Sequence, residues 1–146
     1  MVLLNIMRNI DLFEGLTDSE LEEIAAICKA KHLKKGDILV EEGKRGESFF
    51  IITEGAVEVV IDSTFDTSRR AVLNLGAGQL IGEMSLLEQG PRSATVVAIE
   101  EPTKVQAIRY DDFHQLCEHN TRIGYITMRN MAANISFKLR HFNLSR

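Results

Sequence analysis

Residues 82–95 read Gly-Glu-Met-Ser-Leu-Leu-Glu-Gln-Gly-Pro-Arg-Ser-Ala-Thr. This stretch places an acid, Glu83, directly after a glycine at the start of a short helical run, and Arg92 at the head of a β-rich run. Backbone N–H groups at a helix start and a guanidinium both suit a phosphate. A carboxylate would repel that phosphate, so Glu83 needs another partner, and a ribose hydroxyl can donate to it. The stretch therefore suggests a sugar-phosphate ligand.

Helical patterns lie on both sides of this stretch. Before it, Thr17-Asp18-Ser19-Glu20 has the spacing of a capping box and predicts the start of a helix. The apolar positions that recur at helical spacing after this box are Leu21, Ile24, Ala25 and Cys28. Residues 34–37 predict a turn that ends this part. From residue 111 onward, apolar spacing predicts a short helix and then a longer amphipathic helix from about 122 to 142.

Between about residues 38 and 110 the pattern changes to short strands. The runs that read as strands are 38–40, 49–53, 56–61, 94–99 and 105–108. Glu54-Gly55 is a tight-turn signal between two of these runs, which predicts a hairpin. Ala71, Leu73 and Leu75 alternate with other residues, so we expect them to share one inward face. Residues 63–68 are polar and predict a loop.

Many short strands with Gly-rich turns favour a β-sandwich or a jelly-roll barrel. We therefore predict an α+β, mainly β fold: an eight-stranded jelly-roll β-barrel with an N-terminal helix, a short helix within 82–95 and C-terminal helices. A chain of 146 residues suits one domain. We expect that domain to span 1–146, with the barrel at about 37–110 and the C-terminal helices at about 111–142.

The composition is that of an ordinary globular protein, with 45% hydrophobic and 26% charged residues. A net charge of −4 provides no basic field that would attract nucleic acid or an anionic membrane. We find neither a signal peptide nor an apolar run near the roughly 20 residues that span a bilayer. Cys28 and Cys117 lie in helical patterns far apart, and we expect free thiols rather than a disulfide. These features favour the cytosol.

The order of elements and residues 82–95 together resemble the cyclic nucleotide-binding domain family, the module shared by catabolite activator-type regulators, protein kinase A regulatory subunits and cyclic nucleotide-gated channels. That family's phosphate-binding cassette runs Gly-Glu-(Leu/Met)-(Ala/Ser)-Leu, a short spacer, then Pro-Arg-(Ala/Ser/Thr)-Ala. Here the cassette stands as Gly82 to Leu87, a spacer of Glu88-Gln89-Gly90, and Pro91 to Thr95. The resemblance extends over about residues 12–140.

The resemblance implies roles for the cassette residues. Glu83 would accept from the ribose 2′-hydroxyl, and Arg92 would hold the cyclic phosphate. Gly82 has no Cβ and allows the backbone to approach the ligand. The remaining cassette candidates are Met84 and Ser85 through their N–H groups, Ser93 through its hydroxyl or N–H, and Ala94. Leu73 and Ile81 are expected in the core, where the family's barrel lets them double as an apolar wall for the ligand.

Relatives use the C-terminal helix as a mobile lid, so we expect 111–142 to cover a bound base. Arg129, Asn130 and Asn134 are the candidate polar contacts to that base, although solvent-facing polar residues are common on such helices. The apolar positions of the long helix suit either a lid or a homodimer helix; they are Ile123, Met131, Ile135 and Leu139. An effector protein or domain contacted through this helix is the other partner class.

The sequence shows no residue pattern typical of an enzyme active site. None of the histidines forms a His-x-His pair on a predicted strand, so a barrel-centred metal site lacks ligands. No Ser or Cys stands beside a sequence cue for activation. We therefore expect no catalytic residues, no metal and no cofactor beyond a regulatory cyclic nucleotide.

The sequence leaves two questions open: which cyclic nucleotide is bound, and what the protein does in response. Relatives that prefer cGMP often carry Thr after the cassette arginine, whereas Ser93 also occurs in cAMP binders, so cAMP comes first and cGMP second. We expect no DNA-reading domain within these residues. It is either a whole small protein or a piece of a longer one. The function predicted first is a non-catalytic ligand-sensing module in signal transduction; the alternative is an interaction or dimerisation module that no longer binds nucleotide.

Overall fold

The structure is a computed structural model that describes residues 2–62 and 68–144. It divides into two compact units, one of residues 27–112 and one of residues 1–26 with 113–146. The prediction of a single domain stays a prediction, and the polar loop predicted at 63–68 lies almost wholly outside the described residues.

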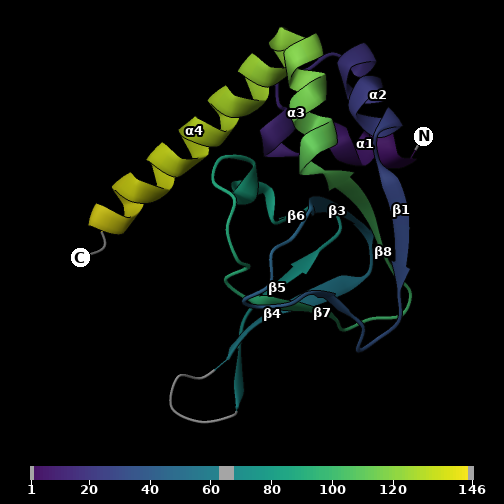
Figure 1. Ribbon diagram of the computed structural model, residues 1–146, viewed down its shortest axis with the longest axis vertical. Helices are drawn as coiled ribbons and strands as arrows, with labels where there is room; N and C mark the ends of the chain where they lie inside the picture. Colours follow the sequence, from purple (N-terminus) through teal and green to yellow (C-terminus); the bar gives the residue numbers. More distant parts are fainter. Residues whose placement is uncertain (1, 63–67, 145–146) are drawn as a thin grey trace. The chain divides into compact units, whose positions relative to one another are not determined.

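The first unit contains two antiparallel sheets of four strands each, in the orders β1-β8-β3-β6 and β2-β7-β4-β5 (Figure 1). The strands are β1 (Lys29–Leu33), β2 (Ile38–Val40), β3 (Ser48–Glu54), β4 (Ala56–Asp62), β5 (Arg69–Gly76), β6 (Leu80–Ile81), β7 (Thr95–Ala98) and β8 (Thr103–Arg109). The predicted jelly-roll fold is confirmed. Strand β1 was missed because Lys29-Ala30-Lys31-His32 carries no apolar alternation, and only Leu33 of the strand is buried.

The predicted hairpin at Glu54-Gly55 is wrong. The chain does turn at Gly55, with φ +83°, but β3 pairs with β6 and β8 while β4 pairs with β5 and β7. The turn therefore carries the chain from one sheet to the other. A turn signal between two apolar runs shows only where the chain changes direction, whereas the strand partners are set by contacts far away in the sequence.

The core of this unit lies between the inward faces of the two sheets. Its buried members are Leu33, Leu39, Val40, Phe50, Ile52, Val57, Ile81, Val96, Ala98 and Val105. Ile81 is a core residue as predicted, but Leu73 is not, because 53% of it is exposed. Ala71 is also exposed and Leu75 is partly buried, so the three do not share an inward face. Strand β5 is an edge strand, and its pairing with β4 shifts register between Val59 and Val60, which interrupts the alternation.

The second unit is helical. Its elements are α1 (Val2–Arg8), η1 (Asp11–Phe13), α2 (Asp18–Ala26), α3 (Tyr110–His119, whose first three residues belong to the other unit) and α4 (Thr121–Leu144). Both C-terminal helices are confirmed. Cys28 lies beyond the end of α2, so its placement in a helix was wrong, whereas Cys117 lies in α3; the two form no disulfide, as expected. In the part of the chain that the structure describes, no helix is long and apolar enough to cross a membrane.

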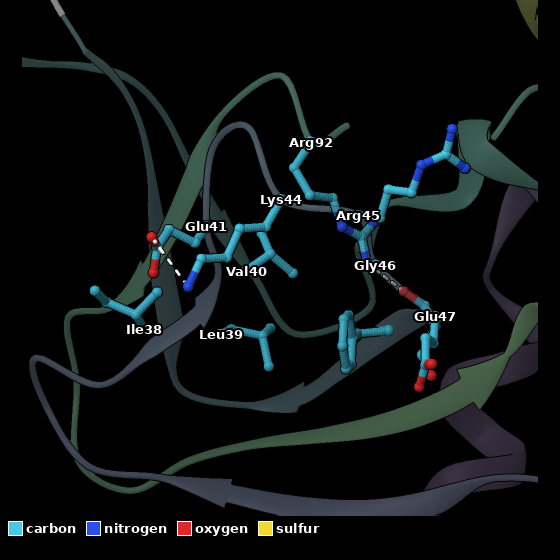
Figure 2. A pocket seen from close by; sticks show the side chains of 11 residues that line it. Ile38, Leu39, Val40, Glu41, Lys44, Arg45, Gly46, Glu47 and Arg92 are labelled. Carbon is cyan, nitrogen blue, oxygen red and sulfur yellow. Dashed lines mark hydrogen bonds and ion pairs between the residues drawn. The ribbon is translucent and has the colours of Figure 1, made fainter. Parts of the chain in front are cut away.

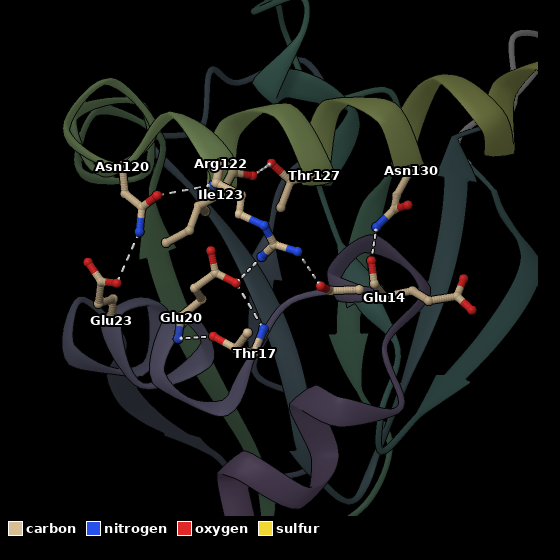
Figure 3. Close-up of polar contacts among 10 residues, drawn as sticks. Glu14, Thr17, Glu20, Glu23, Asn120, Arg122, Ile123, Thr127 and Asn130 are labelled. Atoms are coloured by element: carbon tan, nitrogen blue, oxygen red, sulfur yellow. Dashed lines mark hydrogen bonds and ion pairs between the residues drawn. The ribbon is translucent and has the colours of Figure 1, made fainter.

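The capping box of α2 is confirmed and connects α2 to α4 (Figure 3). The Glu20 carboxylate accepts from the Thr17 N–H at 2.9 Å, and the Glu20 N–H donates to the Thr17 hydroxyl at 3.2 Å. Arg122 donates to the same carboxylate of Glu20, and also to the Gly15 carbonyl at 3.1 Å. Glu20 is only 7% exposed, so these contacts compensate for the burial of its charge.

Candidate functional site

The glycine that opens the cassette sits at the end of β6. Gly82 has φ +79°, in the left-handed region, and it leads into η2 (Glu83–Leu86), a single 3-10 turn. The Ser85 N–H donates to the Gly82 carbonyl at 3.3 Å, so this donor already has a partner within the turn. A four-residue turn has little macrodipole, so attraction of an anion here depends on individual N–H groups and on side chains.

Arg92 is held against the segment that follows β2. The Arg92 N–H donates to the Lys44 carbonyl, and the Gly43 N–H donates to the Arg92 carbonyl, each at 2.8 Å. These two bonds fix the backbone of Arg92 beside residues 43–46. The side chain then reaches over Gly46 and lies half-buried (Figure 2).

The guanidinium of Arg92 has two neutral acceptors. Its Nη1 donates to the Tyr110 hydroxyl at 2.7 Å, and its Nη2 donates to the Ser48 carbonyl at 2.6 Å. Its Nε is buried and has no hydrogen-bond partner among the described residues. An unmade hydrogen bond of this kind costs roughly 1–3 kcal/mol. Both anchored nitrogens of Arg92 bond to neutral groups, and no carboxylate of the described residues accepts from its guanidinium.

Two glycines make room for this guanidinium. A Cβ at Gly46 would lie 2.0 Å from Nη2 of Arg92, and a Cβ at Gly82 would lie 2.4 Å from Nη1. Any other residue at either position would therefore displace the guanidinium. This close packing brings Arg92 to the start of the cassette turn, although the two are ten residues apart in the chain.

The carboxylate of Glu83 is half-buried, and within residues 2–62 and 68–144 it makes no hydrogen bond or ion pair. It is therefore free to accept a hydroxyl donor. Met84 and Ser93 are exposed and Ala94 is half-buried. Of the residues predicted for the site, the structure brings Arg92 and Gly82 into contact.

A pocket of about 360 Å³ lies on one side of Arg92 (Figure 2). Its apolar lining comes from β2 and Phe50, and its charged rim comes from residues 41–47. Arg92 is the one predicted site residue that lines it. Sequence reasoning missed Gly46, Ser48 and Tyr110, and only the glycine, inside a Gly-rich turn region, offered a signal.

The lid candidates lie on α4 in the helical unit. The Asn130 amide donates to the Leu12 carbonyl at 2.9 Å and to the Glu14 carbonyl at 2.8 Å, so its Nδ2 is engaged within that unit (Figure 3). The Arg129 guanidinium lies 5.7 Å from the centroid of the Tyr125 ring, and Asn134 is exposed. Their contact with a base stays a prediction.

We also looked among the described residues for a metal site and for a reactive cysteine. No group of three or more His, Cys, Asp or Glu side chains among them could hold a metal ion. Burial raises the pKa of Cys28 to about 12, and burial also raises the pKa of Cys117, against a smaller opposing effect of its hydrogen bond with Thr127. Both thiols therefore stay protonated near neutral pH and are poor nucleophiles.

Comparison with known proteins gives the family. A family model described as "Cyclic nucleotide-binding domain" matches residues 30–120. The chain belongs to the cyclic nucleotide-binding domain family. This domain is 28% identical over 111 residues to human cGMP-dependent protein kinase 2, and 28% identical over 138 residues to the cyclic AMP receptor protein of Thermus thermophilus. These alignments cover 76% and 94% of the chain, but only 15% of the kinase and 61% of the receptor protein.

A solved structure agrees with this family. The N-terminal domain of a transcriptional regulator from Streptomyces coelicolor A3(2) is 28% identical and superposes with a TM-score of 0.85, over 94% of each chain. The cyclic nucleotide-binding domain of this chain therefore has the fold of its family.

Proposed function

We propose that this domain binds a cyclic nucleotide at its cassette, with cAMP as the first candidate and cGMP as the second, and acts as a non-catalytic regulatory module. The observation that supports the proposal is the hydrogen bonding of the Arg92 guanidinium. Its guanidinium is fixed by two neutral acceptors beside Gly82, and its buried Nε–H has no partner among the described residues. A guanidinium that no carboxylate of the described residues pairs with suits a singly charged cyclic phosphodiester.

The other cassette groups fit the rest of such a ligand. The unpaired Glu83 carboxylate would accept from the ribose 2′-hydroxyl, and the exposed side chain of Leu73 would supply apolar surface. Relatives named for both ligands match this chain, as cGMP-dependent protein kinases and as a cyclic AMP receptor protein. Ser93 offers a hydroxyl to either base, so the order of the two candidates rests on its occurrence in cAMP binders.

The proposed output is a change in the position of α4, or in what it contacts. A ligand that contacts one arrangement better than another shifts the population toward that arrangement. The second candidate function is an interaction module that no longer binds nucleotide. It is favoured by the exposed apolar side chains of Phe137 and Leu139 on α4, which are 55% and 59% exposed.

A thermal-shift screen separates these two functions. A ligand at 100 times its Kd stabilises the folded state by about 2.7 kcal/mol. We expect cAMP or cGMP to raise the melting temperature, AMP to leave it unchanged, and 2′-deoxy-cAMP to raise it less because Glu83 loses its hydroxyl donor. No shift with either cyclic nucleotide at millimolar concentration would support the interaction module instead.

Gly46→Ala should weaken cAMP binding by displacing the guanidinium of Arg92. The new Cβ would overlap the guanidinium of Arg92, which is the mobile end of a long side chain and can move aside. We expect a loss of affinity of about tenfold or more, corresponding to about 1.4 kcal/mol, in calorimetric titrations. Gly76→Ala is the matched control outside the cassette, because its new Cβ would meet only the Gly55 carbonyl oxygen at 3.8 Å and its φ is not positive. Equal affinities of the two variants would contradict the importance of the guanidinium position.

A further inference from the structure

Tyr110 joins the two halves of the cassette. Its hydroxyl accepts from Nη1 of Arg92 at 2.7 Å and donates to the Gly82 carbonyl at 2.7 Å. The same carbonyl of Gly82 accepts from the Ser85 N–H that closes the η2 turn. One hydroxyl therefore connects the arginine after the spacer to the glycine before it.

The position of this hydroxyl is fixed by its own surroundings. Tyr110 is 3% exposed, and its ring stacks on the ring of Phe49 with the centroids 6.1 Å apart and the planes 16° apart. The Tyr110 N–H donates to the Glu47 carbonyl at 2.9 Å, which ties the end of β8 to the start of β3. Neither the ring nor the backbone of Tyr110 can follow a movement of Arg92.

The chemistry of this anchor matters for binding an anion. A carboxylate in place of the hydroxyl would neutralise Arg92 and compete with a phosphate. A tyrosine hydroxyl and a backbone carbonyl are neutral, so they orient the guanidinium and leave its charge available. Because Nη1 and Nη2 each donate to a fixed acceptor, these bonds favour one orientation of the guanidinium before a ligand arrives.

We infer that Tyr110 is a positioning residue for the cassette arginine, acting on the ligand phosphate only through Arg92. The inference rests on the proposed function for its effect on affinity, but the anchoring of Arg92 exists without ligand. Tyr110→Phe keeps the ring and removes the hydroxyl. It leaves Nη1 of Arg92 and one bond of the Gly82 carbonyl unmade, so the guanidinium is no longer held at both ends.

The test is a double-mutant cycle by calorimetry with cAMP. We expect Tyr110→Phe to weaken binding about tenfold in the native background and less than about twofold in the Arg92→Ala background. Tyr125→Phe is the matched control, because Tyr125 is 65% exposed and lies in the helical unit. The Tyr125→Phe protein should bind cAMP with unchanged affinity. An equal loss from Tyr110→Phe in both backgrounds would show a general structural role and overturn the inference.

A ligand-free measurement separates failure of this inference from failure of the proposed function. The Arg92 Nε–H resonance should exchange slowly with solvent in the native protein and at least several times faster in Tyr110→Phe. If cAMP does not bind the native protein, the proposed function fails while the exchange rates still decide the positioning role. Unchanged exchange would overturn it in either case.

A second measurement covers the outcome in which Tyr110→Phe does not fold. The sequence has two tyrosines, so 3-fluorotyrosine labelling of the Tyr125→Phe variant leaves Tyr110 as the sole fluorine probe. Its resonance should differ between this protein and the same protein carrying Arg92→Ala. Identical resonances would show that Tyr110 does not sense Arg92, and would overturn the inference.

Discussion

Replacing Arg92 by alanine should weaken cAMP binding by about thirtyfold to several thousandfold, or about 2–5 kcal/mol. The side chain supplies the charge that faces the phosphate, and both of its anchored nitrogens bond to neutral groups. No carboxylate of the described residues forms an ion pair with it. The positive charge is therefore available to the ligand, and Arg92→Ala removes the cation that we place against the phosphate.

Calorimetric titration of native and Arg92→Ala proteins with cAMP measures this effect. Arg70→Ala is the charge-matched control, since Arg70 is an exposed residue of the edge strand β5 and its removal changes the net charge equally. We expect the Arg70→Ala protein to bind cAMP with an affinity within about twofold of the native protein, because exposed charges are screened by salt. An Arg92→Ala protein that binds cAMP as tightly as the control would remove Arg92 from the site.

The features that the sequence could predict are local ones. The capping box of α2 is confirmed because its two hydrogen bonds join Thr17 and Glu20, three residues apart. The cassette was recognised for a similar reason, because its residues lie within one short stretch. Helices α3 and α4 were visible because a 3.6-residue apolar period is repeated along each of them.

The features that could not be predicted depend on pairing between distant segments. The partner of Arg92 is Tyr110, whose position in the sequence carries no motif and which reaches the cassette only because β8 lies beside β3. The exposure of Leu73 follows from its place on an edge strand next to a register shift, and alternation alone cannot show either. Strand β1 follows from its pairing with β8 and not from its own pattern.

The turn at Gly55 shows both the strength and the limit of local reasoning. The glycine correctly marked a change of direction, since its φ of +83° is the conformation that glycine favours. The sequence could not show that the following strand enters the other sheet. That crossing brings Gly55 against Pro102 of the β7–β8 connection and against Thr103 at the start of β8, so the residue packs at one corner of the barrel.

Gly55→Ala should therefore be among the most destabilising single substitutions in the barrel. A Cβ would lie 2.4 Å from the Thr103 hydroxyl, 2.6 Å from the Pro102 carbonyl oxygen and 2.8 Å from the Thr103 Cα. Two of these are backbone atoms and cannot move aside as the end of a side chain can. We expect about 1–2 kcal/mol from the left-handed backbone and about 1–3 kcal/mol from overpacking.

Gly78→Ala separates these two contributions. Gly78 has a similar φ of +89°, but nothing lies within 4 Å of its new Cβ, so only the backbone cost applies. The melting temperature falls by about 2–4 °C per kcal/mol of lost stability. Gly55→Ala should therefore melt roughly 4–20 °C below the native protein and Gly78→Ala roughly 2–8 °C below it. Urea denaturation gives the corresponding free energies of unfolding. Equal losses in the two variants would mean that the contacts at the corner add nothing, and that the sheet crossing can relax around an added methyl group.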